Sequence, residues 1–148
     1  MPRYRWNEIA ETMITPSHST AKGQTVTGNQ ITLQKIVYRG DRGDGNNGAR
    51  MHNHPEEQFL IVIEGKFQMR EEGTDWFTLA PGDVYHIPAL VMHEMIVDGE
   101  GAIYQFKVRV PGHSVFDHGW APGSKEAWEN HVAQFAEMSR LYKEKNPW

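Results

Sequence analysis

The chain has 148 residues and a mass of 17.0 kDa, which is the size of one domain with a single hydrophobic core. It contains 8 His and no Cys, so disulfides, thiolate nucleophiles, zinc fingers and iron–sulfur clusters are excluded, and we expect any metal to be held by imidazole, carboxylate or amide groups. The net charge of −4 argues against a nucleic-acid partner. No apolar run reaches the ~20 residues of a membrane helix, and Met1–Ala10 lacks a signal peptide's apolar stretch, so we expect a cytoplasmic protein without a membrane partner.

Short apolar runs, separated by turns that contain glycine or proline, dominate the middle of the chain. They are rich in β-branched and aromatic residues and predict strands over Ile31–Tyr38, Gln58–Ile63, Lys66–Arg70, Trp76–Leu79, Val84–Ile87, Met95–Val97 and Ala102–Val110. Turns are predicted at Glu64-Gly65, Glu72-Gly73, Pro81-Gly82-Asp83 and Asp98–Gly101. Short strands with no helical period between them favour an all-β protein, an antiparallel sandwich or a small barrel.

Two segments flank this predicted barrel. We expect an N-terminal arm over residues 1–29, the barrel over 30–112, and a C-terminal loop and helix over 113–148. Ser124 is a plausible N-cap, and apolar residues from Trp128 to Tyr142 recur at helical spacing. This helix is predicted to pack on the outside of the barrel or on a second subunit. The longest predicted irregular stretch is the loop Arg39–Arg50.

The segment that begins at Met51 carries the most informative side chains. In an extended strand, residues of the same parity point to the same side, so His52 and His54 project together and can reach one metal ion. If the strand resumes after Pro55, Gln58 returns to that side. The alternative interpretation is two surface histidines on a loop. The later run from Pro81 through Pro88 to His93 adds a turn, a short strand and a further histidine, and favours the metal site.

Together these two segments resemble the paired motifs of the cupin superfamily. The residues that carry the resemblance are His52-x-His54-x3-Gln58-x6-Gly65 and Gly82-x5-Pro88-x-Leu90-x2-His93. The sequence departs from the family pattern at Gln58, where Glu is commoner, at Asn46 and Leu90, where Gly is expected, and at Val97, where Asn is expected. The resemblance implies a cupin fold, which is a double-stranded β-helix or jelly-roll barrel, here with a C-terminal α-helix.

The resemblance also implies a metal site. Its ligands would be His52, His54, Gln58 and His93, around one divalent ion: zinc first, with nickel, manganese or iron as alternatives. Gln58 gives the site a neutral amide in place of a carboxylate, so the ion would keep its full positive charge and act as a strong Lewis acid.

Two further residues are candidates for acid–base catalysis. His86 lies in the predicted strand Val84–Ile87 and faces either the pocket or the outside. Tyr104 shares a strand face with Phe106 and Val108, and it would place its hydroxyl near the metal if that apolar face points inward. The alternative interpretation of Tyr104 is a core residue with its hydroxyl at the rim.

We therefore expect a metal-dependent enzyme with non-redox enol or carbonyl chemistry, an isomerase, ring-opening enzyme, cyclase or lyase. Cupins with similar sites imply an unsaturated uronate or a polyketide as the small-molecule substrate. Two alternatives stay open: a ferrous dioxygenase that cleaves a β-diketone or an aromatic diol, and a non-catalytic ligand-sensing barrel. Tryptophans near both ends need burial, which favours a homodimer.

Overall fold

A computed structural model describes residues 2–110, and nearly all of its regular structure is β-strand. One 3₁₀ turn, η1 (Trp6–Glu8), precedes the strands. The strands are β1 (Thr12–Met13), β2 (Ala21–Thr27), β3 (Ile31–Tyr38), β4 (Asn47–His52), β5 (Gln58–Glu71), β6 (Phe77–Leu79), β7 (Val84–Ile87) and β8 (His93–Val108). The predicted C-terminal helix lies outside the described residues. Within them, no helix is long and apolar enough to cross a membrane.

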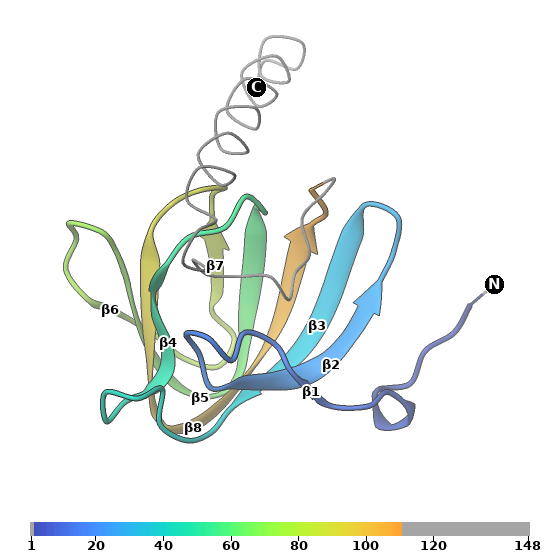
Figure 1. Ribbon diagram of the computed structural model, residues 1–148, viewed down its shortest axis with the longest axis horizontal. Coiled ribbons are helices and arrows are strands. Elements are labelled where there is room, and N and C mark those ends of the chain that lie inside the picture. The colour runs from blue at the N-terminus through green and yellow to red at the C-terminus, as the bar shows by residue number, and fades with distance from the viewer. Residues whose placement is uncertain (1, 111–148) are drawn as a thin grey trace, which may run out of the picture.

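The strands form one antiparallel sheet that curves around a common interior (Figure 1). Its order is β1-β2-β3-β8-β5-β6, while β4 pairs with β8 and β7 pairs with β5. All pairings are antiparallel. The expected all-β barrel is thereby confirmed.

Two long strands replace four of the predicted short ones. β5 continues through Gly65 and β8 continues through Gly101, at positions that the sequence indicates as turns. The register between the two strands shifts on either side of Glu64, so the strands bend here instead of reversing. Gly65 has a φ of 88°, and a Cβ there would lie 2.5 Å from the carbonyl oxygen of Glu100. The turn-forming residues therefore mark a bend at which the two backbones pack closely.

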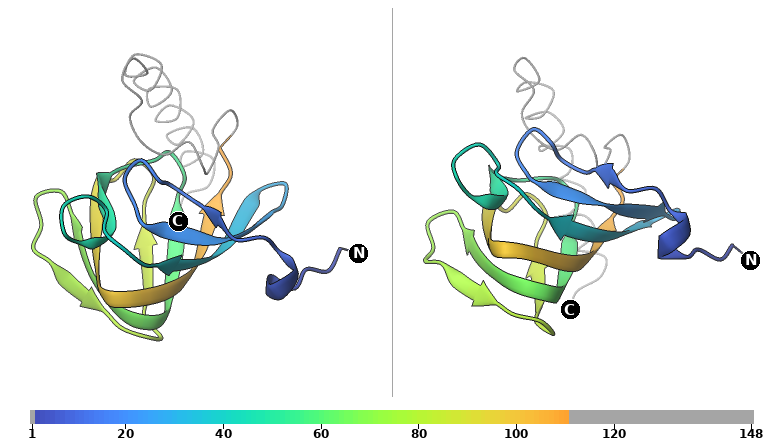
Figure 2. Two further views of the ribbon diagram at one scale, coloured as in Figure 1. Left: turned by 60° about the horizontal axis from the view of Figure 1, so that its bottom comes forward. Right: turned by 90° about the horizontal axis from the view of Figure 1, so that it is seen from below.

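The sheet also begins earlier than the sequence indicates. β2 pairs with β3 over its whole length, from Ala21 opposite Tyr38 to Thr27 opposite Thr32. The predicted N-terminal arm, residues 1–29, therefore contains a full strand of the sheet. The strand is hard to recognise because it is polar and contains Gly23, whose missing side chain admits the backbone of β3. The segment before β2 also runs beside β4, where Thr20 N–H donates to Gly48 O at 2.9 Å (Figures 1 and 2).

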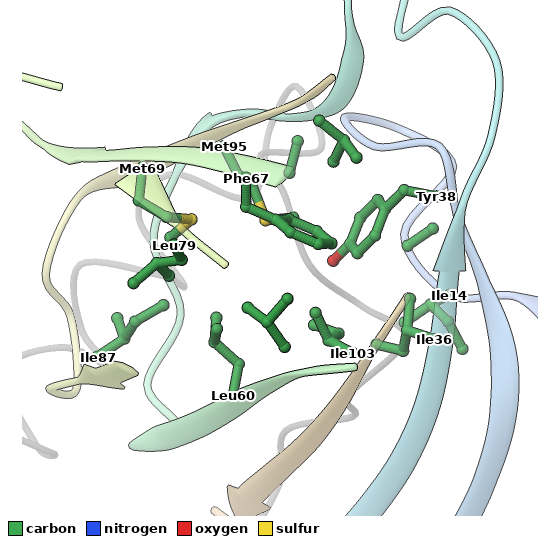
Figure 3. Close-up of a cluster of buried hydrophobic side chains, with 14 residues drawn as sticks. Ile14, Ile36, Tyr38, Leu60, Phe67, Met69, Leu79, Ile87, Met95 and Ile103 are labelled. Atoms are coloured by element: carbon green, nitrogen blue, oxygen red, sulfur yellow. The ribbon is translucent and has the colours of Figure 1, made fainter. Parts of the chain in front are cut away.

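The core fills the interior between the inner faces of β3, β5, β7 and β8 (Figure 3). Phe67, Ile87 and Ile103 are completely buried, and Tyr38 packs edge-on against Phe67 with ring centroids 5.9 Å apart. The apolar side chains do not fill the whole interior. Toward the upper end of Figure 1, where β4 ends and β5 and β8 begin, the inner residues become polar.

Candidate metal centre

Three histidines meet at this polar end of the barrel. His52 is the last residue of β4 and lies opposite His93, the first residue of β8. His54 follows β4 by two residues and is 1% exposed. The ligand nitrogens of the three side chains all lie within 4.8 Å of one another. The ring centroid of His93 is 4.4 Å from that of His52 and 5.0 Å from that of His54, so the rings surround one small space.

The same local hydrogen bond orients each ring. Nδ1 of His52 lies 2.6 Å from Arg50 O, Nδ1 of His54 lies 2.9 Å from Glu56 O, and Nδ1 of His93 lies 2.8 Å from Val91 O. A carbonyl oxygen only accepts, so each Nδ1 carries the hydrogen and donates it. In a neutral imidazole this leaves the lone pair on Nε2, which is the arrangement that metal-binding histidines have in proteins.

Gln58, the first residue of β5, adds an amide beside the histidines. Its side chain is 4% exposed, and its buried Oε1 has no hydrogen-bond partner among the described residues. A buried carbonyl without a partner costs free energy unless something accepts its lone pair. A divalent cation would do so, and imidazole with amide oxygen is a donor set that zinc, iron and nickel accept. The residues present therefore fit a metal ion.

Burial keeps the two most affected histidines neutral. Desolvation lowers the pKa of His93 from 6.5 to about 4, and the nearby Lys107 and His18 act in the same direction. Desolvation also lowers the pKa of His52 well below its usual value, with further contributions from His93 and His18. A neutral ring is the form that binds a cation. At neutral pH a metal would therefore displace no proton from these two rings.

The polar face of β8 points into the barrel, and the apolar face with Phe106 and Val108 points outward. This is the opposite of the arrangement considered from the sequence. Gln105 and Lys107 are 5% and 4% exposed, whereas Phe106 and Val108 are 36% and 45% exposed and lie on the outer face. Lys107 sits opposite Gln58 in the strand register. Sequence reasoning missed Lys107 because an alternating strand normally turns its apolar face inward. The position of Lys107 could have been predicted from one consideration: buried polar side chains such as Gln58 need polar neighbours on the facing strand.

His18 is a second residue that sequence reasoning did not place at the site. Its ring centroid lies 4.3 Å from that of His52, and its Nδ1 lies 3.0 Å from Ser17 Oγ. The residue is 8% exposed and belongs to the segment between β1 and β2. No motif connects it to the other histidines, because only the fold brings this segment next to β4.

The two catalytic candidates lie elsewhere. Exposed His86, on the outer side of β7, has Nε2 2.7 Å from Glu57 Oε1 and stacks on Phe59. Tyr104 stacks on Trp6 with ring centroids 6.0 Å apart, on the outer face of β8. Neither side chain lines the cavity beside the histidines. Successive residues of a strand point to opposite faces. Ile87 and Gln105 are buried on the inner face, so their neighbours His86 and Tyr104 lie on the outer face.

A cavity of about 30 Å³ adjoins the histidines, enough for one or two groups of the size of water. Its polar lining comprises Thr15, Ser19, Tyr38, His52, Gln58, His93, Gln105 and Lys107. Its apolar lining comprises Ile14, Ala21, Ile36, Ala49, Leu60, Met69, Ile87 and Met95. The cavity therefore joins an edge with candidate metal ligands to an apolar floor. Fold and site together define a small antiparallel barrel with a candidate three-histidine metal centre.

Comparison with known proteins agrees with this description. Residues 43–105, which hold all four candidate ligands, match the model of the Cupin_2 family, described as a cupin domain. Over these residues the chain is similar to a cupin domain. A search of curated protein sequences gives no significant match.

Three solved structures with the same fold illustrate the likeness. KdgF from Halomonas sp. has a TM-score of 0.60 at 16% identity, over 75% of this chain and 96% of its own. A sugar phosphate isomerase from Silicibacter pomeroyi has a TM-score of 0.60 at 12% identity, over 74% and 77%. The polyketide cyclase RemF from Streptomyces resistomycificus has a TM-score of 0.58 at 16% identity, over 77% and 87%. At these identities the likeness concerns the fold.

Proposed function

We propose that the protein is a metal-dependent cupin enzyme that catalyses non-redox enol or carbonyl chemistry on a small oxygenated substrate, with zinc as the metal. The observation that carries this proposal is the donor set: three imidazoles held as Nδ1–H tautomers and the buried, unpartnered amide oxygen of Gln58. Isomerisation, ring opening, cyclisation and elimination all belong to this chemistry, and the sequence-based candidates for the substrate are an unsaturated uronate and a polyketide.

The neutral donor set has a direct chemical consequence. A bound divalent ion would act as a Lewis acid that polarises a carbonyl group and stabilises an enolate. Gln58 contributes an oxygen without a negative charge, so the four side chains leave the charge of the ion uncompensated. Leu60, Ile87 and Met95 form an apolar floor in the same cavity, and apolar surroundings strengthen electrostatic interactions.

The fold neighbours are consistent with this class of reaction. Of the three structures compared above, one is an isomerase and one is a cyclase by name, and neither type of reaction consumes an oxidant. The shared fold by itself does not define the reaction, since one fold supports many chemistries. The proposal therefore rests on the ligands, and the neighbours only add to its support.

The first experiment measures the metal. The protein purified without chelators should contain close to one equivalent of zinc by elemental analysis, and His93→Ala and Gln58→Ala should lose most of it. His86→Ala is the matched control, because His86 lies on the outer surface and should keep the metal. If the metal content of the His93 and Gln58 variants equals that of the wild type, the site assignment is wrong.

The second experiment measures the chemistry. Metal-loaded protein in D₂O is incubated with a panel of keto acids, β-diketones and unsaturated uronates, and proton exchange or rearrangement at the α-carbon is followed by NMR. We expect exchange with at least one class of compound, and its loss in His93→Ala. Oxygen consumption at substantial turnover with a β-diketone or an aromatic diol would contradict the proposal and favour a dioxygenase.

A further inference from the structure

A buried lysine lies on the wall of the cavity that holds the candidate ligands. Lys107 is on the inner face of β8, directly opposite Gln58 in the strand register, and lines the cavity together with His52 and His93. Only 4% of its surface is exposed. Lysine is almost never buried to this degree unless a charge or a ligand compensates it. Buried Glu56 supplies such a charge, so the wall beside the candidate ligands carries a pair of buried charged groups.

The wall around Lys107 is organised by hydrogen bonds. Gln105 Nε2 donates to Gln34 Oε1 at 2.8 Å, and Gln34 Nε2 donates to Thr25 Oγ1 at 3.1 Å. These amides are fully buried and engaged with one another across β2, β3 and β8. They hold the strand that carries Lys107 in place, but they add no charge. Lys107 is the one lysine or arginine side chain that lines this cavity in the described part of the chain.

The charges around the cavity do not balance once a divalent ion is present. The imidazole and amide donors of His52, His93 and Gln58 and the phenol of Tyr38 add no negative charge to the lining. Glu56, completely buried, is the acidic group that interacts electrostatically with Lys107. One carboxylate offsets one ammonium, so the charge of the ion is left without a counter-charge. In a water-poor cavity such an excess favours an anionic ligand.

We propose that Lys107 is a substrate-binding residue that, together with the metal, makes the site selective for small organic acids. A carboxylate or a comparable anion would place one oxygen toward the three histidines and accept hydrogen bonds from the Lys107 ammonium group with its other oxygen. This inference rests on the proposed function. It narrows the substrate to an acid, so it favours the uronate class over a neutral polyketide.

Lysine suits this role better than the other polar groups nearby. Its ammonium group carries a full charge and three hydrogen-bond donors on a flexible side chain. It can therefore adjust its position to an oxygen of the bound substrate. A hydrogen bond from a charged donor to a carboxylate is about twice as strong as one from a neutral amide. Loss of the charge should therefore weaken the binding of an acid much more than the binding of a neutral analogue.

The test uses the full chain loaded with Co²⁺, whose visible spectrum reports both metal occupancy and the binding of small ligands. Acetate and acetamide are the probes, since they have the same shape and differ in charge. We expect wild-type protein to bind acetate about 10- to 100-fold more tightly than Lys107→Met does, with little change for acetamide. Lys107→Arg should restore part of the preference for acetate.

Lys35→Met is the matched control. Lys35 lies on β3 opposite Tyr104, on the outer face of the same sheet, so its removal should leave both affinities unchanged. Lys107→Gln provides a second neutral variant in case Lys107→Met does not fold or does not take up Co²⁺. Circular dichroism and the Co²⁺ spectrum without added ligand establish folding and occupancy for each variant.

Two results would overturn the inference, and they are distinguishable. If Co²⁺ binds normally but the Lys107 variants bind acetate within about twofold of wild type, Lys107 does not select acids while the metal site stands. If wild-type protein takes up no Co²⁺, or His93→Ala takes up as much, the proposed function fails and the inference fails with it.

Discussion

At each of the three histidines, the backbone within two residues decides which ring nitrogen is presented to the shared centre. The carbonyl groups of Arg50, Glu56 and Val91 each accept the hydrogen of Nδ1. These acceptors are local, so the orientation of each ring follows from the short peptide that carries it. The three rings then converge because β4 and β8 pair at His52 and His93. Local sequence thus sets the tautomer, and strand pairing brings the rings together.

The low pKa of His93 predicts a pH-dependent stability of the metal-free protein. The unfolded chain binds a proton near pH 6.5 and folded His93 only near pH 4, so the unfolded state holds more protons between these values. Stability is therefore lost as the pH falls from about 6.5 to 4, by about 3 kcal/mol for this residue. Urea denaturation at several pH values, compared between wild type and His93→Asn, measures the contribution. An equal pH dependence in both proteins would contradict it.

Arg42 shows how a residue of the predicted loop Arg39–Arg50 becomes part of the interior. Its guanidinium group, 3% exposed, lies 2.6 Å from Glu94 Oε1 and donates to the carbonyl oxygens of Ala49 and Met95. The residue therefore clamps β4 to β8 next to the strand ends that carry His52 and His93. The sequence indicates an irregular loop, whereas β4 already begins at Asn47.

Removal of the Arg42 side chain should lower the stability of the fold. Arg42→Met leaves part of the charge of buried Glu94 and two buried carbonyl groups uncompensated, so we expect a loss of about 3 kcal/mol in the free energy of unfolding. Arg39→Met is the control, because Arg39 and Glu100 form an ion pair with side chains 63% and 69% exposed. Its effect should stay within about 0.5 kcal/mol. Chemical denaturation compares the two, and similar losses would contradict the clamp.

At the scale of elements, the bend shared by β5 and β8 shapes the barrel. A Cβ at Gly101 would lie 2.6 Å from the Phe67 ring, and one at Gly65 would meet the backbone of β8. Both glycines thus admit close packing at the point where the strands bend, and Gly101 packs against the ring of Phe67 in the core. Because of the bend, β5 and β8 each contribute both to the apolar core and to the polar end with the candidate metal ligands.

Two glycines with similar backbone conformations separate the effect of strain from that of packing. Gly65 and Gly73 have φ values of 88° and 80°, but a Cβ at Gly73 would meet nothing within 4 Å. Gly73→Ala should cost only the left-handed strain, about 1 kcal/mol. Gly65→Ala adds a backbone clash, and we expect a loss of about 3 kcal/mol or more. Thermal or urea denaturation measures the difference, and equal losses would show that close packing at the bend does not matter.

For the whole molecule, a bound metal should contribute to stability because the folded site holds it and the unfolded chain does not. With free zinc at 1,000 times its dissociation constant the gain is about 4 kcal/mol. A strong chelator should then lower the melting temperature by about 10 °C. Differential scanning calorimetry measures the shift, and His93→Ala should show none. A wild-type melting temperature that does not respond to the chelator would contradict a metal centre.

The homodimer expected from the sequence stays a prediction at this scale. The outer face of the sheet exposes apolar side chains in neighbouring strands, among them Phe59 opposite Phe106 and Ile31 opposite Val108. Apolar surfaces of this kind are typical of contact regions. Sedimentation equilibrium should give twice the chain mass of 17.0 kDa, and a single-chain mass at micromolar concentration would contradict the prediction.

The sequence by itself determined the class of the fold and grouped the three histidines with Gln58. Strands such as Ile31–Tyr38 and Val84–Ile87 have the bounds that their composition predicts. This succeeds because strand alternation and ligand spacing are local properties, set within a few residues along the chain. Prediction from local composition fails for the polar strand β2 and for Gly65, where a turn is predicted. At both places the close contact with another strand determines the backbone conformation.

Only the tertiary structure decided which other side chains lie beside the three histidines and the adjoining cavity. Lys107 and His18 come to the histidines from distant segments, while His86 and Tyr104 turn to the outer surface. In a strand with one apolar and one polar face, the sequence alone favours the apolar face inside. At the end of the barrel with the candidate ligands this preference is reversed, because the buried Gln58 and histidines need polar neighbours across the strand pairing.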